Sequence, residues 1–286
     1  MKVSGFTFVR NGQILGYPFV ESIRSILPLV DEFVIALGPC EDETEPMIRA
    51  IGDPKIRLMP SQWNECMRDR GYVYAQQKMS AQFNTTGDWA FYLEADEVVH
   101  EADLPLIRQA MEKYLGDPEV EALFFDYLHF YGNKNSYLDS PGWYRREVRI
   151  IRNSIRSYAV DGQFWYVLEK NRTGRYPKAA PTGARMFHYG WVRSERQMNL
   201  KSEKVNQYWN EAPRQVIYGD IDPAIVREFR GTHPRIVWDW LPPAEGLFRT
   251  DPGYQLTAKD RKRRWVAKLE RLLRRDLSKF HFRQVR

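Results

Sequence analysis

The sequence is poor in cysteine and has no long apolar segment. Its two cysteines, Cys40 and Cys66, are too few for a disulfide framework and are not spaced as a CxxC pair, which favours free thiols in a reducing cytosol. The longest apolar run, residues 33–38, has about six residues, whereas a membrane-spanning helix needs roughly 20. The first ten residues lack the cleavage site of a secretory signal. We therefore expect a cytoplasmic protein without a membrane-spanning helix.

The excess of positive charge is confined to one end of the chain. The 286 residues include 43 Lys and Arg against 37 Asp and Glu, a net charge of +6. Residues 259–286 hold 12 of the basic residues and three acidic ones, so they carry +9 and residues 1–258 carry −3. A slightly acidic main body argues against nucleic-acid binding as the function of the whole protein.

Hydrophobic spacing predicts alternating strands and helices in the first part of the chain. Short apolar runs predict strands at 3–9, 32–38, 55–59 and 89–93. Helical spacing is found at 15–30, 43–51, 71–83 and 104–115. Strands joined by helical crossovers form a mostly parallel sheet, and ligands bind beyond the carboxyl ends of its strands. The residues that follow each strand are therefore candidates for a binding site.

The second part of the chain has a different pattern. Strands are predicted at 122–131, 148–151 and 164–168 without clear helices between them, and residues 132–135 are predicted to form a loop. A helix is expected at 194–209, followed by irregular chain over 210–256. Seven of the nine tryptophans lie after residue 140. The predicted organisation is thus 1–115, then an aromatic-rich half at 116–256, then a basic helix at 257–286.

An acidic motif, Glu94-Ala95-Asp96, directly follows the strand predicted at 89–93. Two carboxylates two residues apart in an extended segment project to the same side. Their oxygens suit a hard divalent cation that also holds phosphates. The alternative is an acidic turn that caps the following helix.

At these residues the sequence resembles the family 2 glycosyltransferases of GT-A fold, in which a strand leads into a DxD-type motif. The resemblance covers residues 3–195 and is strongest at 71–104. Further along, Gly142-Trp143-Tyr144, two arginines (Arg149 and Arg152) and Phe187-His188-Tyr189 are similar to bacterial members that glycosylate lipopolysaccharide core sugars. The resemblance implies an α/β, Rossmann-like, mostly parallel sheet flanked by helices. It also implies that residues 1–115 bind a nucleotide-sugar and that 116–256 bind the acceptor.

The resemblance implies Mn²⁺ or Mg²⁺ as cofactor. Asp96 matches the direct metal ligand, and Glu94 matches a contact to the donor ribose or to a metal-bound water. His188 matches a later histidine that completes the metal shell, although a buried, hydrogen-bonded histidine is an alternative. The positions implied for nucleotide-sugar binding are Arg10, Asn11, Glu41, Asp42, Gln77, Lys78, Glu94, Ala95 and Asp96. For Lys78, a solvated helix charge is equally compatible with the sequence.

The chain departs from the family pattern in three respects. Residues 38–44 replace the usual pair of aspartates after the second strand, and the first acid of the metal motif is Glu94. The third departure is that no acid matches the general base that an inverting transferase needs to deprotonate the acceptor hydroxyl. Asp161, which precedes a glycine in a turn, is favoured over Glu147 and Glu169, and Glu147 is more simply an ion-pair partner.

Aromatic residues of the second half offer flat faces to sugar rings. The residues considered for acceptor binding are Trp143, Tyr144, Trp165 and Trp191. Large aromatic side chains are also common in protein cores, and the sequence leaves both interpretations open.

The basic C-terminal helix is amphipathic. Trp265, Leu269, Leu272 and Leu273 are spaced i, i+4, i+7 and i+8, with Lys and Arg around them. Such a helix binds an anionic membrane surface or packs on the main body.

Together these features predict a metal-dependent, inverting glycosyltransferase. It would transfer a sugar from a nucleotide-sugar to a glycan or lipid-linked acceptor, in the cytoplasm or peripherally at the inner face of a bacterial-type membrane. One alternative is a sugar-nucleotidyltransferase, which needs a glycine-rich loop after the first strand, where this chain has only Arg10-Asn11-Gly12. The other is a non-enzymatic protein whose basic tail binds membrane or nucleic acid.

Overall fold

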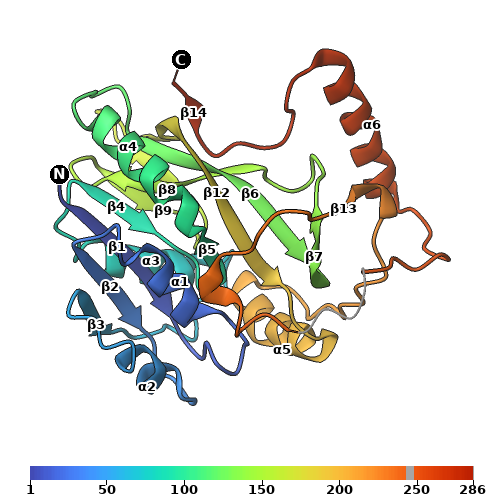
Figure 1. The fold of residues 1–286 in the computed structure, drawn as a ribbon, viewed down its shortest axis with the longest axis horizontal. Coiled ribbons are helices and arrows are strands. Elements are labelled where there is room, and N and C mark those ends of the chain that lie inside the picture. Colours follow the sequence, from blue (N-terminus) through green and yellow to red (C-terminus); the bar gives the residue numbers. More distant parts are fainter. Residues whose placement is uncertain (243–247, 286) are drawn as a thin grey trace.

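The structure is a computed structural model that describes residues 1–242 and 248–285, and it is built on one large sheet (Figure 1). Four neighbouring strands of the sheet are parallel, in the spatial order β3, β2, β1, β4. They are β1 (Val3–Val9), β2 (Glu32–Leu37), β3 (Ile56–Pro60) and β4 (Trp89–Tyr92). The predicted α/β class, with a parallel sheet flanked by helices, is confirmed.

Helices join and cover these strands, as their apolar spacing predicts. They are α1 (Phe19–Ile26), α2 (Thr44–Arg49), α3 (Tyr72–Gln82) and α4 (Leu104–Leu115), which follows η1 (Glu101–Asp103). One hydrophobic cluster packs α1 and α4 against one face of the sheet. A second cluster on the other face includes Ala81 of α3 and the fully buried Trp165. Burial of both faces explains the continuous apolar runs of β2 and β4.

Beyond β4 the sheet becomes mixed. β8 (Arg146–Arg152) is antiparallel to β4, and β6 (Ala122–Tyr131) is antiparallel to β8. The edge is formed by β7 (Asn133–Leu138) and β13 (Val226–Glu228). The loop predicted at 132–135 is therefore wrong from Asn133 onward, because Gly132, at φ +72, makes the turn alone and lets β7 pair back on β6.

A long strand, β12 (Lys178–Trp191), was not predicted. It runs parallel to β6 and pairs antiparallel with the short β5 (Glu97–Val99), which places His188 opposite Glu97. Its register on β6 shifts between Pro181 and Arg185, so the alternation of apolar residues is broken. A separate three-stranded sheet contains β9 (Ser157–Ala159), β10 (Trp165–Leu168) and β11 (Gly174–Arg175).

The remaining chain wraps around the sheet. Helix α5 (Glu195–Asn206) continues into η2 (Gln207–Trp209), as predicted. The segment expected to be irregular contains η3 (Pro223–Ile225) and η4 (Arg235–Val237), and its residues 243–247 lie outside the described part. No helix among the described residues is long and apolar enough to cross a membrane.

The C-terminal segment leaves the body and returns to it. The basic helix predicted at 257–286 is present as α6 (Ala258–Leu273), at one edge of the molecule (Figure 1). The prediction is wrong after Leu273, because Arg274 adopts a left-handed conformation that ends the helix. After it, β14 (Arg283–Gln284) pairs with the start of β12, and Phe282 stacks on Phe124 with ring centroids 4.5 Å apart. His281 is buried, with its Nδ1 2.5 Å from Oε2 of Glu147. The main body thus holds the chain that follows α6.

Candidate active site

A cavity of about 410 Å³ opens at the carboxyl ends of the parallel strands. Its lining includes Arg10 and Asn11 after β1, Glu41 after β2, and the segment 94–96 after β4. The opposite wall comes from α5 and η2. The cavity therefore lies where a parallel α/β sheet is expected to bind its ligand.

Six of the residues predicted for donor binding line this cavity: Arg10, Asn11, Glu41, Glu94, Ala95 and Asp96. The other three lie outside the lining. Asp42 accepts hydrogen bonds from the backbone amides of Ile14 and Thr44 and so joins two loops. Gln77 is buried and donates to the carbonyl of Gln62.

Lys78 is fully buried, so the alternative of a solvated helix charge is wrong. Its Nζ donates to the carbonyl oxygen of Gln163 at 3.0 Å and lies 3.5 Å from the ring centroid of Trp165. Burial, together with the nearby charge of Arg149, lowers the pKa of this amine well below its usual value. Lys78 Nζ also lies over the ring of Tyr92, and Tyr92 is one of the residues that line the cavity.

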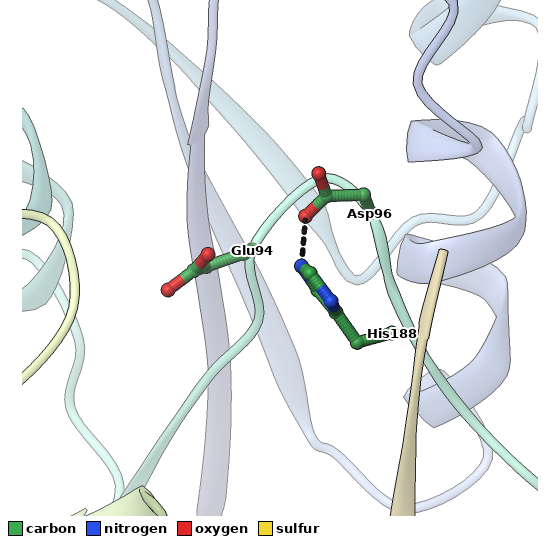
Figure 2. A group of neighbouring side chains, drawn as sticks. All are labelled: Glu94, Asp96 and His188. Atoms are coloured by element: carbon green, nitrogen blue, oxygen red, sulfur yellow. Dashed lines mark ion pairs between the residues drawn. The ribbon is translucent and has the colours of Figure 1, made fainter. Parts of the chain in front are cut away.

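Glu94, Asp96 and His188 form a group that could hold a metal ion. One ligand atom from each residue lies within 4.8 Å of the others. Figure 2 shows Asp96 and His188 pointing toward each other, with Glu94 beside them on the segment between β4 and β5. The pairing of β12 with β5 brings His188 to this place from far along the chain.

Hydrogen bonds to a second histidine fix which nitrogen of His188 carries its proton. His129 Nε2 lies 2.7 Å from the carbonyl oxygen of Tyr144, which only accepts, so this nitrogen is protonated. Burial and the proximity of His188 lower the pKa of His129 to about 3, so its Nδ1 is an acceptor. The partner of that atom, at 3.0 Å, is Nδ1 of His188, which must therefore donate.

The remaining nitrogen of His188 is an acceptor that faces another acceptor. Burial lowers the pKa of His188, so the ring is neutral and Nε2 has a free lone pair. Nε2 lies 3.7 Å from Oδ1 of Asp96. A Cβ added at Gly190 would lie 2.6 Å from the His188 ring and 3.0 Å from Oδ2 of Asp96, so only glycine leaves this space open. Two carboxylates and a lone-pair imidazole nitrogen fit Mn²⁺ or Mg²⁺.

Two basic side chains near Asp96 were missed by the sequence analysis. Lys201 Nζ lies 3.1 Å from Asp96 Oδ2, and Arg193 Nη2 lies 4.0 Å from the same oxygen. Burial opposes ionisation of Asp96, but the positive charges of Lys201 and Arg193 hold the pKa of its carboxyl below the usual value. Arg193 is also buried, and its Nε and Nη2 have no hydrogen-bond partner among the described residues.

The start of α5 explains how these basic groups reach the cavity. Ser194 and Gln197 form a capping box, which fixes the first turn of the helix. Lys201 and Lys204 then lie three residues apart on one face, and both line the cavity. The pattern Ser-x-x-Gln at 194–197 was a signal for this helix start, but the sequence did not indicate which sheet edge the helix would face.

Aromatic side chains form another wall of the cavity. Phe8, Trp63, Tyr74 and Tyr208 are in mutual ring contact and all line it. Arg10 lies over the Trp63 ring, 5.2 Å from its centroid, and forms an ion pair with Glu65. Trp63 Nε1 is buried without a hydrogen-bond partner among the described residues. Trp63 and Glu65 follow β3. The rule that ligands bind beyond the carboxyl ends of parallel strands, which selected Glu41 after β2, therefore also applied to these two residues.

Arg149 links the metal motif to the neighbouring loop. Its fully buried guanidinium donates to Glu94 Oε1 and Glu97 Oε2, each at 2.8 Å, and to the carbonyl oxygen of Gln163 at 3.0 Å. Burial and the carboxylate of Glu97 raise the pKa of Glu94, whereas Arg149 opposes this shift. Arg149 thus fixes the Glu94 side chain from behind.

The three candidate bases lie at different places. Asp161 is in the turn that precedes Gly162 and Gln163, which line the cavity, and its Oδ1 accepts from the amide of Gln163 at 2.7 Å. Glu147 is fully buried against His281. Glu169 forms an ion pair with Arg175 at the surface.

The four aromatic residues considered for acceptor binding are not among the residues that line the 410 Å³ cavity. Trp165 is fully buried under β4 and α3. Trp143 and Trp191 pack edge to face, with centroids 5.8 Å apart, and are partly exposed. Tyr144 packs against His129, with centroids 4.6 Å apart.

Comparison with known proteins finds no matching family model and no matching curated protein. Among solved structures, the chain is similar to glucosyl-3-phosphoglycerate synthase from Mycobacterium tuberculosis in complex with Mn²⁺, UDP-glucose and phosphoglyceric acid. That match has 17% identity and a TM-score of 0.32, and covers 44% of each chain. The match to S. aureus TarS has 13% identity and a TM-score of 0.35, and covers 54% of this chain and 29% of that one. The chain thus spans less than half the length of these proteins.

Replacing Arg149 with methionine should destabilise the protein strongly. The substitution leaves the fully buried Glu97 carboxylate without its guanidinium partner, which costs about 3–5 kcal/mol. Arg146→Met is the matched control, because Arg146 is on the same strand but pairs with Asp126 at the surface, where an ion pair contributes about 1 kcal/mol or less. Urea unfolding of both variants measures the difference. Equal losses of unfolding free energy would contradict the role given to Arg149.

Proposed function

We propose that this chain is a metal-dependent glycosyltransferase of the family 2, GT-A type. It transfers a sugar from a nucleoside-diphosphate sugar to a hydroxyl of a glycan or lipid-linked acceptor, by inversion, in the cytoplasm or at the inner face of the membrane. The observation that carries the proposal is the position of Asp96. Its carboxylate is at the end of β4, beside His188 and Lys201, on the wall of a cavity large enough for a small-molecule ligand.

The charges around Asp96 suit a diphosphate group. Asp96 and His188 would hold Mn²⁺ or Mg²⁺, with Glu94 contacting the donor ribose or a water of the metal. Such a cation supplies Lewis acidity and neutralises the leaving diphosphate. Lys201 and Lys204 line the same cavity and would bind phosphate oxygens directly. Arg193 balances the charge of Asp96 from the buried side.

The aromatic wall suits the nucleobase. Trp63 and Tyr208 present ring surfaces to the cavity, and base–aromatic stacking contributes about 1–3 kcal/mol. Arg10 and Glu41 are at the same end of the cavity and would contact polar edges of the nucleoside.

Asp161 does not itself line the cavity, but of the three candidate bases it alone is followed directly by lining residues, and we assign to it the proton of the acceptor hydroxyl. Its Oδ1 holds the turn that carries Gly162 into the cavity wall, and its Oδ2 has no hydrogen-bond partner among the described residues. Glu147, by contrast, is occupied by His281 in the interior. The partly exposed Trp143 and Trp191, with Tyr144, remain the proposed surface for the acceptor.

The structure gives no support to the nucleotidyltransferase alternative. A triphosphate loop needs free backbone amides after the first strand. Here the amides of Gln13 and Ile14 donate to Thr44 Oγ1 and Asp42 Oδ2, and those of residues 15–17 donate within the turn. This turn has too few free donors to hold a triphosphate.

A thermal-shift screen of UDP-, GDP- and dTDP-sugars, with and without Mn²⁺, tests the proposal. We expect one nucleotide-sugar to raise the melting temperature only when Mn²⁺ is present, because ligand binding stabilises the folded state by mass action. Asp96→Asn should abolish this shift and lower transfer by about a thousandfold, while Asp126→Asn, a surface change, should retain both. The proposal fails if no nucleotide-sugar stabilises the protein, or if Asp96→Asn is fully active.

His129 is proposed as a positioning residue for His188. Groups that orient a metal ligand through its second nitrogen typically affect metal affinity by 10–100-fold, so His129→Phe should weaken Mn²⁺ binding by about that factor. Electron paramagnetic resonance of free Mn²⁺ measures this affinity directly. His233→Phe is the control, because His233 is a half-buried histidine that forms hydrogen bonds with the Tyr189 hydroxyl and the Lys134 carbonyl oxygen and not with His188. Unchanged affinity in His129→Phe would rule out the positioning role.

Asp161→Asn tests the choice of base. Asparagine keeps an oxygen that accepts from Gln163, so the turn should be retained while the basic group is lost. We expect kcat to fall by about 10²–10⁴-fold with little change in donor affinity. Steady-state transfer rates and donor titration separate the two effects. A wild-type rate would assign the role to another acid.

A further inference from the structure

Helix α6 turns its polar side toward the protein. Arg264 donates to both carboxylate oxygens of Asp222, at 2.8 and 2.6 Å, and Glu270 accepts from Arg145 at 2.8 and 3.2 Å. Asp260 is buried at the start of the helix, where its carboxylate accepts a hydrogen bond from the backbone amide of the N-cap residue Thr257. The contacts that fix α6 to the body are therefore charged and hydrogen-bonded.

The apolar side of α6 faces outward. Trp265 is 73% exposed and Leu272 is 79% exposed, and Leu269 and Leu273 are 45% and 50% exposed. At 3.6 residues per turn these four residues form one stripe, here called the α6 stripe. A helix that serves only to cover its own protein would bury this stripe, so the orientation is the reverse of the one expected for internal packing.

The charge around the α6 stripe is of one sign. Lys262, Lys268 and Arg271 are exposed, and none forms an ion pair with an acidic group in residues 1–242 and 248–285. The acidic residues of the segment are engaged on the inner side: Asp260 in the helix cap, and Glu270 and Asp276 with Arg145. The outer surface of α6 is therefore apolar along its centre and basic along its flanks.

We propose that the α6 stripe binds the surface of an anionic lipid bilayer. Trp and Leu side chains insert at the boundary between headgroups and acyl chains, and flanking Lys and Arg are attracted to anionic headgroups. The shape favours a bilayer over a folded partner. α6 is a single convex helix at the edge of the molecule (Figure 1), whereas a stable protein interface covers about 800 Å² per partner with complementary shape.

This inference names the surface by which the protein would reach the membrane, and it is independent of sugar transfer, because adhesion to lipid needs neither donor nor metal. Its failure would leave the transferase proposal intact, and failure of the transferase proposal would leave the vesicle result intact.

Co-sedimentation of the full chain with vesicles tests the proposal. We expect binding to vesicles of phosphatidylcholine with phosphatidylglycerol, weaker binding at high salt, and little binding to pure phosphatidylcholine. The double variant Trp265→Ser/Leu272→Ser should bind about tenfold more weakly or worse, since the inserted apolar groups are lost. Both side chains are largely exposed, so folding should be unaffected. Phe83→Ser, at a position 75% exposed elsewhere on the surface, is the matched control and should bind like wild type.

Charge reversal tests the electrostatic part separately. Lys262→Glu/Lys268→Glu should weaken binding to anionic vesicles by more than about tenfold, since each basic group near the surface contributes about fivefold. Lys170→Glu, in an exposed turn of the body, should have little effect. The proposal is overturned if the wild type does not bind anionic vesicles, or if the stripe variant binds as well as Phe83→Ser. Light scattering that shows a wild-type dimer which the stripe variant converts to a monomer would also overturn it, since a second copy would then cover the stripe.

Discussion

The candidate site depends on one buried guanidinium. Arg149 is enclosed between the metal motif, the carboxylate of Glu97 and the loop that carries Gln163. Two carboxylates and two carbonyl oxygens, those of Val148 and Gln163, converge on it, so a positive charge that would be costly alone is balanced in the interior. Since β8 carries Arg149 into this position, the antiparallel half of the sheet supports the candidate site at the end of the parallel half.

The parallel half could be predicted well because its strands and helices depend on local spacing. Val3–Val9 and Trp89–Tyr92 are short apolar runs bounded by polar turns, and the rule that ligands bind beyond such strands selected Glu94 and Asp96. Strand β12 could not be predicted in this way. Pro181 and Gly183 interrupt its pattern, and its pairing with the three-residue β5 is a long-range contact.

The same distinction applies to the site. Asp96 follows its strand directly, whereas Lys201 reaches it only through the packing of α5 against the sheet edge. His188 was selected through a resemblance, and the structure adds the reason for its orientation: a chain of hydrogen bonds from Tyr144 through His129. The environment of Lys78 could not be predicted, because helical spacing alone gave no indication that its amine would be enclosed by Trp165 and Tyr92.

The return of the chain to the sheet after α6 has a mechanical consequence. Ion pairs of Arg145 and Arg264 fix the helix itself, and the contact of His281 with Glu147 and the pairing of β14 with β12 fix the segment that follows. Because both α6 and the segment after it are attached to the body, the helix is held in a fixed orientation relative to the sheet. Binding of α6 to a bilayer would therefore fix the tilt of the whole protein relative to the bilayer plane. It would also fix the direction from which molecules in that plane approach the cavity.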